Sequence, residues 1–154
     1  MGLEIVPDPR LDGRTVADAM VRRPKLLGAA TTVAEAHDFF ADDHVHCALI
    51  VAGRKLLAVV ERSDLRMSLP SQAPAVALGS LDARVVRPDA DLRTSWDAMT
   101  ASRRRRLAVI DDNGNCVGLL CLKRSGTGFC SDADVEARAA EFADRVSCCA
   151  DLAD

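Results

Sequence analysis

Apolar and polar positions follow the same order twice along the chain. Residues 33–51, VAEAHDFFADDHVHCALIV, align without a gap with residues 92–110, LRTSWDAMTASRRRRLAVI, at an offset of 59. Only Asp38 and Asp97 are identical, but the apolar positions coincide, as where ALIV lies over LAVI. An internal repeat of this kind indicates two copies of one structural unit.

The first copy begins with a predicted helix. Thr32 and Glu35 form a Thr-x-x-Glu capping box, which predicts a helix from this point through about Asp43. The apolar residues of the segment fall on one face of such a helix: Val33, Ala36, Phe39 and Phe40. This face is expected to pack against a core.

Two strands and a short helix are predicted next. Residues 47–51 form a continuous apolar run, which is typical of a strand buried on both faces. A tight turn at 52–54 leads into a second strand at 56–60. Ser63 is expected to cap a short helix that stops before Pro70.

The second copy predicts the same order. A helix at 92–102 precedes strands at 107–110 and 116–122, with a turn between the strands. The breaker sequence at 125–128 argues against a final helix. A weaker echo, DAMVRRP at 18–24 against DARVVRP at 82–88, is out of register with the offset of 59.

The end of the chain predicts one further helix. Residues 131–153 read as an amphipathic helix capped by Ser131. Its apolar residues recur at spacings of three and four and form one stripe: Val135, Ala139, Phe142, Val146 and Cys149.

Composition and charge narrow the class of protein. The 154 residues suffice for one compact core, and 49% of them are apolar. A net charge of −3 gives no long-range attraction to nucleic acid or to an acidic membrane. No apolar run approaches the roughly 20 residues of a membrane span, and the first residues lack a secretory apolar region. We therefore expect a cytoplasmic protein without a membrane association.

The six cysteines form no CxxC pair. Cys47, Cys116 and Cys121 lie in apolar runs and read as small buried hydrophobes in a reducing compartment. No set of cysteines and histidines has the spacing of a zinc site, so no metal site is expected.

Several short segments, taken in order, resemble a tandem pair of CBS (cystathionine β-synthase) domains, also called a Bateman module. They are TVADAM at 15–20, TTVAEA at 31–36, AVVERSDL at 58–65 and RRLAVIDDNGNCVGLL at 105–120. No single motif is specific, and the duplicated order carries the resemblance over residues 15–124.

The resemblance implies an α+β fold of two repeated β-α-β-β-α CBS units packed about a pseudo-twofold axis, plus the C-terminal amphipathic helix. The expected parts of the chain are an N-terminal extension at 1–14, CBS unit 1 at 15–70, a linker at 71–78, CBS unit 2 with a degenerate end at 79–125, and the C-terminal helix at 131–153.

Members of this family bind adenosine-containing ligands in clefts between the units, so the resemblance also implies a site. Asp64 occupies the ribose-binding position and Glu61 stands where a threonine is usual. Arg105 and Arg106 occupy the phosphate side of the same cleft. The second cleft would hold His46, Cys121 and Arg124, and it has lost the residues expected for ribose.

Each of these residues has a plainer interpretation. Asp64 also suits a helix start, where the helix dipole favours an acidic residue. Arg103 to Arg106 also suit the solvated end of a helix. In an extended chain Arg104 and Arg106 would face one way and the other two the opposite way. A carboxylate at 61 would repel phosphate unless a cation lay between them.

Two functions remain open. The first is a free-standing regulatory module that needs no cofactor, binds AMP, ADP, ATP or S-adenosylmethionine, and signals to a protein effector. The alternative is a degenerate pair that binds no nucleotide and acts as a dimerisation scaffold. Either would form a homodimer through CBS helix faces. No nucleophile elbow or P-loop indicates an enzyme, and the arginine run lacks the aromatic residues of a nucleic-acid binder.

Overall fold

The computed structural model of the chain describes residues 11–43, 45–123 and 128–131. Six strands form two three-stranded sheets, in the orders β1-β2-β3 and β4-β5-β6. In each sheet the middle strand is parallel to the first and antiparallel to the third. The strands are β1 (Leu26–Gly28), β2 (Cys47–Ala52), β3 (Lys55–Glu61), β4 (Val85–Val86), β5 (Arg106–Ile110) and β6 (Cys116–Cys121). The predicted repetition of one α+β unit is confirmed.

The first unit's main helix is α2 (Val33–Phe39). The predicted capping box forms: the Thr32 hydroxyl accepts from the Glu35 N–H at 3.2 Å, and the Glu35 carboxylate accepts from the Thr32 N–H at 3.1 Å. The helix is shorter than expected. Ala41 N–H donates to the Asp38 carbonyl three residues back, which tightens the last turn and ends the helix before Asp43.

The short helix after β3 begins earlier than predicted. It is a 3₁₀ helix, η2 (Arg62–Arg66), with Glu61 and not Ser63 at its N-cap. The Asp64 carboxylate accepts from the Glu61 N–H at 2.8 Å, and the Glu61 side chain accepts from the backbone of Asp64 in return. Two carboxylates thus make the capping box that a hydroxyl at 63 was expected to provide.

The second unit repeats the first even in the position of its register shift. Its helix α3 (Leu92–Ser102) has the predicted bounds. The register of β2 against β3 shifts between Ile50 and Val51, and that of β5 against β6 shifts between Val109 and Ile110, at the same offset of 59. β1 and β4 keep that offset in their pairing with β2 and β5. The out-of-register echo at 18–24 and 82–88 therefore marks no structural equivalence.

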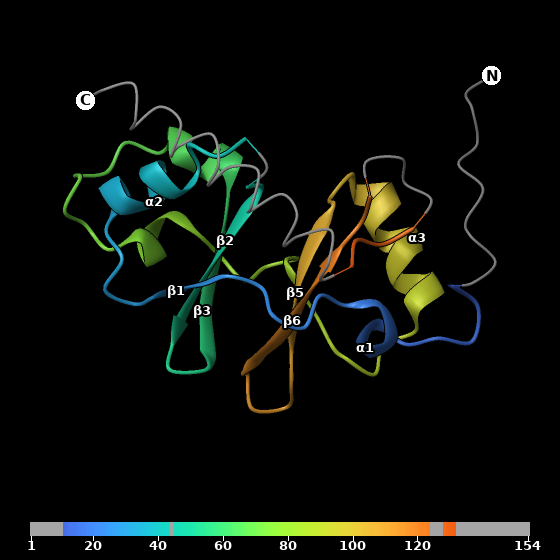
Figure 1. Cartoon of the computed structure of the whole chain (residues 1–154). Helices are drawn as coiled ribbons and strands as arrows, with labels where there is room; N and C mark the ends of the chain where they lie inside the picture. Colours follow the sequence, from blue (N-terminus) through green and yellow to red (C-terminus); the bar gives the residue numbers. More distant parts are fainter. Residues whose placement is uncertain (1–10, 44, 124–127, 132–154) are drawn as a thin grey trace, which may run out of the picture.

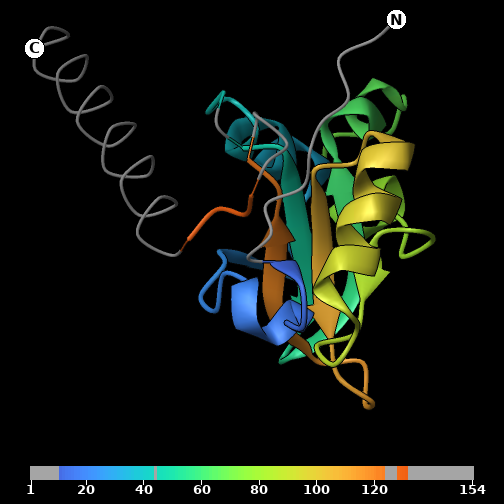
Figure 2. The same ribbon diagram turned by 90° about the vertical axis from the view of Figure 1, so that its right-hand side faces the viewer.

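The segment that enters each unit packs on the other unit. Helix α1 (Val16–Ala19) contacts α3 and β6, and it lies beside α3 on the right of Figure 1 although it precedes β1 in the chain. Viewed from that side, α1 lies near the lower end of α3 (Figure 2). The 3₁₀ helix η3 (Ala75–Leu78) contacts α2 and β3 in the first unit. The two units are therefore joined by exchanged segments.

The exchange is symmetric in its hydrogen bonds. Val21 and Leu119 exchange two backbone hydrogen bonds, and Ser80 and Val59 exchange the equivalent pair. The hairpin turns also meet, since Leu56 N–H donates to the Gly114 carbonyl at 3.0 Å and Cys116 N–H donates to that of Arg54 at 2.8 Å. These pairs confirm the predicted pseudo-twofold axis.

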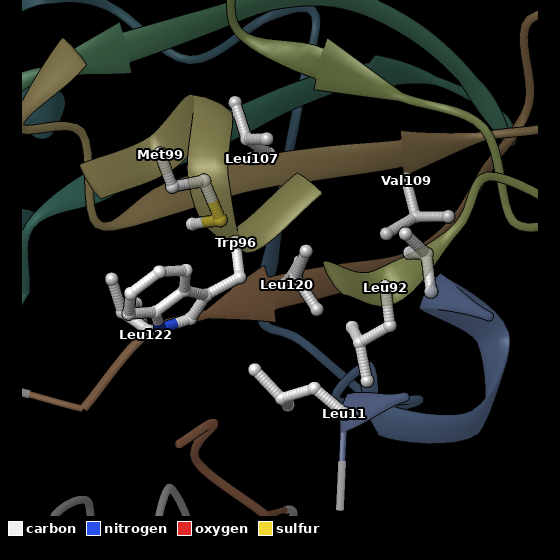
Figure 3. Packing of buried hydrophobic residues seen from close by; sticks show 9 residues of the cluster. Leu11, Leu92, Trp96, Met99, Leu107, Val109, Leu120 and Leu122 are labelled. Atoms are coloured by element: carbon white, nitrogen blue, oxygen red, sulfur yellow. The ribbon is translucent and has the colours of Figure 1, made fainter. Parts of the chain in front are cut away.

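Each middle strand is buried on both faces, which explains its continuous apolar run. Ala48 and Ile50 pack under α2, whereas Leu49 and Val51 pack toward the second sheet in a cluster that includes Ala108. In the second unit, Figure 3 shows Trp96 beside Leu122 and Leu92 close to Leu11, a residue of the entry segment. The exchanged segments thus complete the cores.

The predicted C-terminal helix at 131–153 lies outside the described residues, apart from Ser131. Among the residues that the structure describes, no helix has the length and apolar character needed to cross a membrane.

Candidate functional site

Charged side chains from both units meet where β3 ends. Arg84, just before β4, makes a bidentate contact with Asp64: Nη1 donates to Oδ2 at 2.6 Å and Nη2 donates to Oδ1 at 3.3 Å. The same Nη1 donates to the Val59 carbonyl at 2.7 Å. A two-pronged contact of this kind is the geometry for which the guanidinium is suited.

Glu61 is held by two arginines. Arg104 Nε donates to Glu61 Oε2 at 2.8 Å and Arg104 Nη2 to Oε1 at 3.0 Å. Arg84 Nε lies 3.3 Å from the same Oε1. Asp64, Arg84, Glu61 and Arg104 therefore form one continuous ion network, which we call the charge cluster.

The charge cluster is mostly buried and electrically balanced. The exposed fraction of its side chains runs from 13% for Arg84 to 25% for Arg104. The hydrogen bond with Asp64 raises the pKa of Arg84, and the one with Glu61 raises the pKa of Arg104. Two cations and two carboxylates leave no net charge, so Glu61 does not present an uncompensated negative charge to a ligand.

Asp64 has little hydrogen-bonding capacity left. A carboxylate offers about four acceptor positions. Three are taken: Oδ2 accepts from Arg84 and from the Glu61 N–H, and Oδ1 accepts from Arg84. One position on Oδ1 therefore remains for a hydroxyl group while Arg84 stays in place.

Arg106, the first residue of β5, is the cation beside this cluster. It is 9% exposed, and within the described part of the chain its side chain makes no hydrogen bond or ion pair. Its charge and that of Glu61 both act on Cys47, at the start of β2, whose pKa burial raises to about 12. A buried guanidinium without an anionic partner is costly, so this position favours an anion.

Arg104, Arg105 and Arg106 alternate as expected for an extended chain, and Arg103 does not take part. Arg104 turns to Glu61 and Arg106 to the region of Cys47, whereas Arg105 Nε donates to the Leu122 carbonyl at 3.3 Å, beyond the end of β6. Arg103 is exposed and caps α3 in the left-handed conformation, with φ of 57°. Arg106 therefore shares the surroundings of Cys47 with Glu61 of the charge cluster, whereas Arg105 turns to the end of β6.

The equivalent half of the molecule has none of this chemistry. At the repeat offset of 59, Cys47 matches Arg106 and Lys25 matches Arg84. Cys121 matches Glu61 because each pairs with one of the first two, Cys121 with Arg106 and Glu61 with Cys47. His46, the counterpart of Arg105, is half-buried, and Arg124 lies outside the described residues. We call this region, with its thiols in place of charges, the thiol half. In the described ranges no group of three metal-ligating side chains gathers anywhere.

Arg84 is the site residue that sequence reasoning missed. The arginine run at 103–106 is recognisable in the sequence because it is contiguous, whereas Arg84 is a single arginine before a two-residue strand. The signal that could have found it is the carboxylate at 61, which needed a neighbouring cation. Arg104 supplies that cation together with Arg84.

Comparisons with known proteins identify the family of the chain. The family model described as "CBS domain" matches residues 16–71 and 78–124. The chain therefore belongs to the CBS domain family, and it carries two copies of the domain. CBS pairs are generally regulatory modules. No curated protein sequence gave a match.

Solved structures of CBS pairs share the fold. The CBS pair domain of a putative Mg²⁺ transporter from Shewanella oneidensis MR-1 is 27% identical, with a TM-score of 0.63 over 74% of this chain and 68% of the other. CBSX2 in complex with AMP is 24% identical, with a TM-score of 0.62 over 74% and 93%. The cytosolic domain of the Mg²⁺ channel MgtE in complex with ATP is 18% identical, with a TM-score of 0.59 over 73% and 48%.

Proposed function

We propose that the chain is a regulatory CBS pair that binds a phosphorylated adenosine ligand where its two units meet, with Arg106 as the phosphate contact. Arg106 carries the proposal, because it is a buried cation without a described partner. The similar folds of CBSX2 with AMP and MgtE with ATP support the choice of ligand.

The charge cluster fits this role in a specific way. Asp64 would accept one ribose hydroxyl at its remaining position, while Arg84 keeps the carboxylate oriented. Arg84 and Arg104 neutralise Glu61, which removes the repulsion that this carboxylate would otherwise exert on phosphate. Ligand binding would then be signalled to a protein effector, and the module would pair as a homodimer.

One observation favours the alternative, a dimerisation scaffold without a nucleotide. Most acceptor positions of Asp64 already receive hydrogen bonds from the protein itself, so this carboxylate has little capacity left to bind a ribose. The thiol half offers no replacement site. The two functions therefore differ in whether Arg106 meets a ligand.

The first experiment measures thermal unfolding of the full chain with adenosine, AMP, ADP, ATP and S-adenosylmethionine. A ligand present at about 100 times its dissociation constant should stabilise the protein by about 2.7 kcal/mol. We expect no shift with adenosine and a shift with AMP, ADP or ATP, because Arg106 would contact the phosphate.

The matched variants are Arg106→Met and Arg103→Gln. Met keeps an aliphatic chain of similar length in the buried position and removes the charge, so nucleotide affinity should fall about 10- to 100-fold, as expected for a lost charge-assisted hydrogen bond. Arg103 is exposed, and its variant should bind as the parent does. Unchanged affinity of Arg106→Met would remove Arg106 from the site, and no shift with any ligand would leave the scaffold. Light scattering of the purified protein tests the homodimer separately.

A further inference from the structure

Two buried thiols lie side by side at the end of β6. Cys121 Sγ and Cys130 Sγ are 3.0 Å apart, and the two residues are 2% and 1% exposed. Neither is part of a disulfide within the residues that the structure describes. They belong to different segments, since Cys130 comes from residues 128–131, which return along the strand after the end of β6.

The backbone holds the two cysteines directly opposite each other. Cys130 N–H donates to the Cys121 carbonyl at 2.7 Å, and Leu122 and Phe129 form the next antiparallel bridge. Hydrogen-bonded opposite residues have Cα atoms about 5.5 Å apart, which lies inside the range of about 4.4 to 6.8 Å that a disulfide spans. The backbone can therefore accept a bond between these sulfurs without rearrangement.

A cavity of about 390 Å³ reaches Cys130. Its lining includes Arg14, Arg22 and Lys123 against the single carboxylate of Asp18. This volume is ample for a small oxidant such as hydrogen peroxide, and the cavity brings it to the Cys130 side.

We propose that Cys121 and Cys130 form a redox-responsive pair, oxidised to a disulfide by hydrogen peroxide that enters through this cavity. The Cys130 thiolate displaces hydroxide from the peroxide and becomes a sulfenic acid. The Cys121 sulfur then displaces hydroxide from the sulfenic sulfur, and each hydroxide takes up the proton that one thiol has lost. Two thiols and one peroxide thus give one disulfide and two water molecules, and a thiol reductant reverses the change.

The bond would fasten residues 128–131 to β6. In the reduced protein this segment is held by non-covalent contacts, among them the hydrogen bond from Lys123 N–H to the Gly128 carbonyl at 2.8 Å and the packing of Phe129 on the core of the second unit. Cys121 also occupies the position that Glu61 has in the charge cluster, so oxidation changes the thiol half and leaves the charge cluster untouched. This inference does not rest on nucleotide binding.

The test treats the reduced full chain with hydrogen peroxide, alkylates the remaining thiols under denaturing conditions and maps tryptic peptides by mass spectrometry. Trypsin separates the two cysteines, so a bond joins peptide 107–123 to peptide 125–138 with the loss of two hydrogens. We expect this linked pair in the parent and in Cys116→Ala, which removes the other cysteine of peptide 107–123. It should be absent from Cys121→Ala and from Cys130→Ala.

A second measurement keeps the test independent of digestion. Closing a loop of about ten residues should raise the melting temperature of the oxidised parent by about 5 to 10 °C over the reduced parent. Dithiothreitol should remove this difference, and reduced Cys121→Ala should unfold in one transition with no response to peroxide. Full alkylation of both cysteines after peroxide treatment would overturn the proposal. A disulfide from either cysteine to Cys148 or Cys149 would also overturn the proposal. Zinc that the purified protein retains after dialysis against a chelator would do the same.

Discussion

The two halves of the region around the pseudo-twofold axis share a backbone and differ in nearly every polar side chain. One half holds the charge cluster of Glu61, Asp64, Arg84 and Arg104, and the thiol half has Cys121 where Glu61 stands in the other. Apolar periodicity determines strand register and helix position, so it preserves the frame in both halves. Residues at the ends of the strands are free of that constraint, and they diverge.

Under the proposed function, this comparison predicts one ligand site and not two. The charge cluster gathers two cations from the second unit around two carboxylates of the first, with Arg106 beside them. Among the described residues at the matching positions, the thiol half has Cys47 in place of Arg106 and the exposed Lys25 in place of Arg84. A phosphorylated ligand would therefore distinguish the two halves by charge.

The largest effect should come from a change to the frame that both halves share. A Cβ atom at Gly79 would lie 2.6 Å from the Val59 carbonyl oxygen, which is fixed by its hydrogen bond with Ser80. Gly79→Ala should therefore destabilise the protein by about 3 kcal/mol, as overpacking does when backbone must shift.

Gly28→Ala is the matched control, because nothing lies within 4 Å of the added Cβ and its φ is not positive. Urea denaturation of both variants measures the difference. Equal stability of the two would mean that the exchanged segments are not packed tightly against the partner unit.

The next effect separates the two halves. Arg84→Met removes the cation shared by Asp64 and Glu61, and it leaves Asp64 with a single backbone donor among the contacts given above. We expect a loss of about 2 kcal/mol, the typical value of hydrogen bonds to charged groups.

The control is the equivalent residue of the thiol half. Lys25 is exposed, and its ammonium lies 5.1 Å from the Phe39 ring centroid, so Lys25→Met should change stability by no more than about 0.5 kcal/mol. Chemical denaturation of the two variants side by side makes the measurement. A similar loss in both would show that the charge cluster contributes nothing specific.

Features of the frame that depend on local sequence patterns could be predicted from the sequence, whereas contacts between distant residues could not. The repeat, the capping box at Thr32 and the bounds of α3 all depend on local patterns, and all are confirmed. The exchange of entry segments was not foreseen, because its hydrogen bonds join residues as distant as Val21 and Leu119.

The site was predicted only in part. Asp64 and Glu61 follow a motif, but their arginine partners come from the other unit, at separations of 20 and 43 residues. Strand alternation predicted that Arg105 and Arg106 face opposite ways, but both were assigned to the phosphate side, and no local pattern could indicate that Arg106 is buried. Long-range pairing of charges has no period in the sequence, which is why the charge cluster appeared only with the fold.

The smallest effect concerns the helices that cover the two sheets, since they begin with different caps. The Asp91 carboxylate accepts from the Thr94 N–H at 2.9 Å and from its hydroxyl at 2.8 Å, and these bonds lower the pKa of Asp91. A carboxyl whose pKa is lower in the folded state contributes stability above its unfolded value of about 3.9, and this contribution is lost as the pH falls through the folded value.

Asp91→Ser keeps a cap without a titrating group, so the melting temperature of the parent should fall more than that of this variant between about pH 6 and about pH 3. Scanning calorimetry of both proteins at the two pH values measures this difference in melting temperature. The pKa values of Asp18 and Asp111 are also lowered, but both residues are present in both proteins, so their effect cancels in the comparison. A gap between the two melting temperatures that does not change with pH would mean that Asp91 acts on α3 only as a neutral hydrogen-bond acceptor.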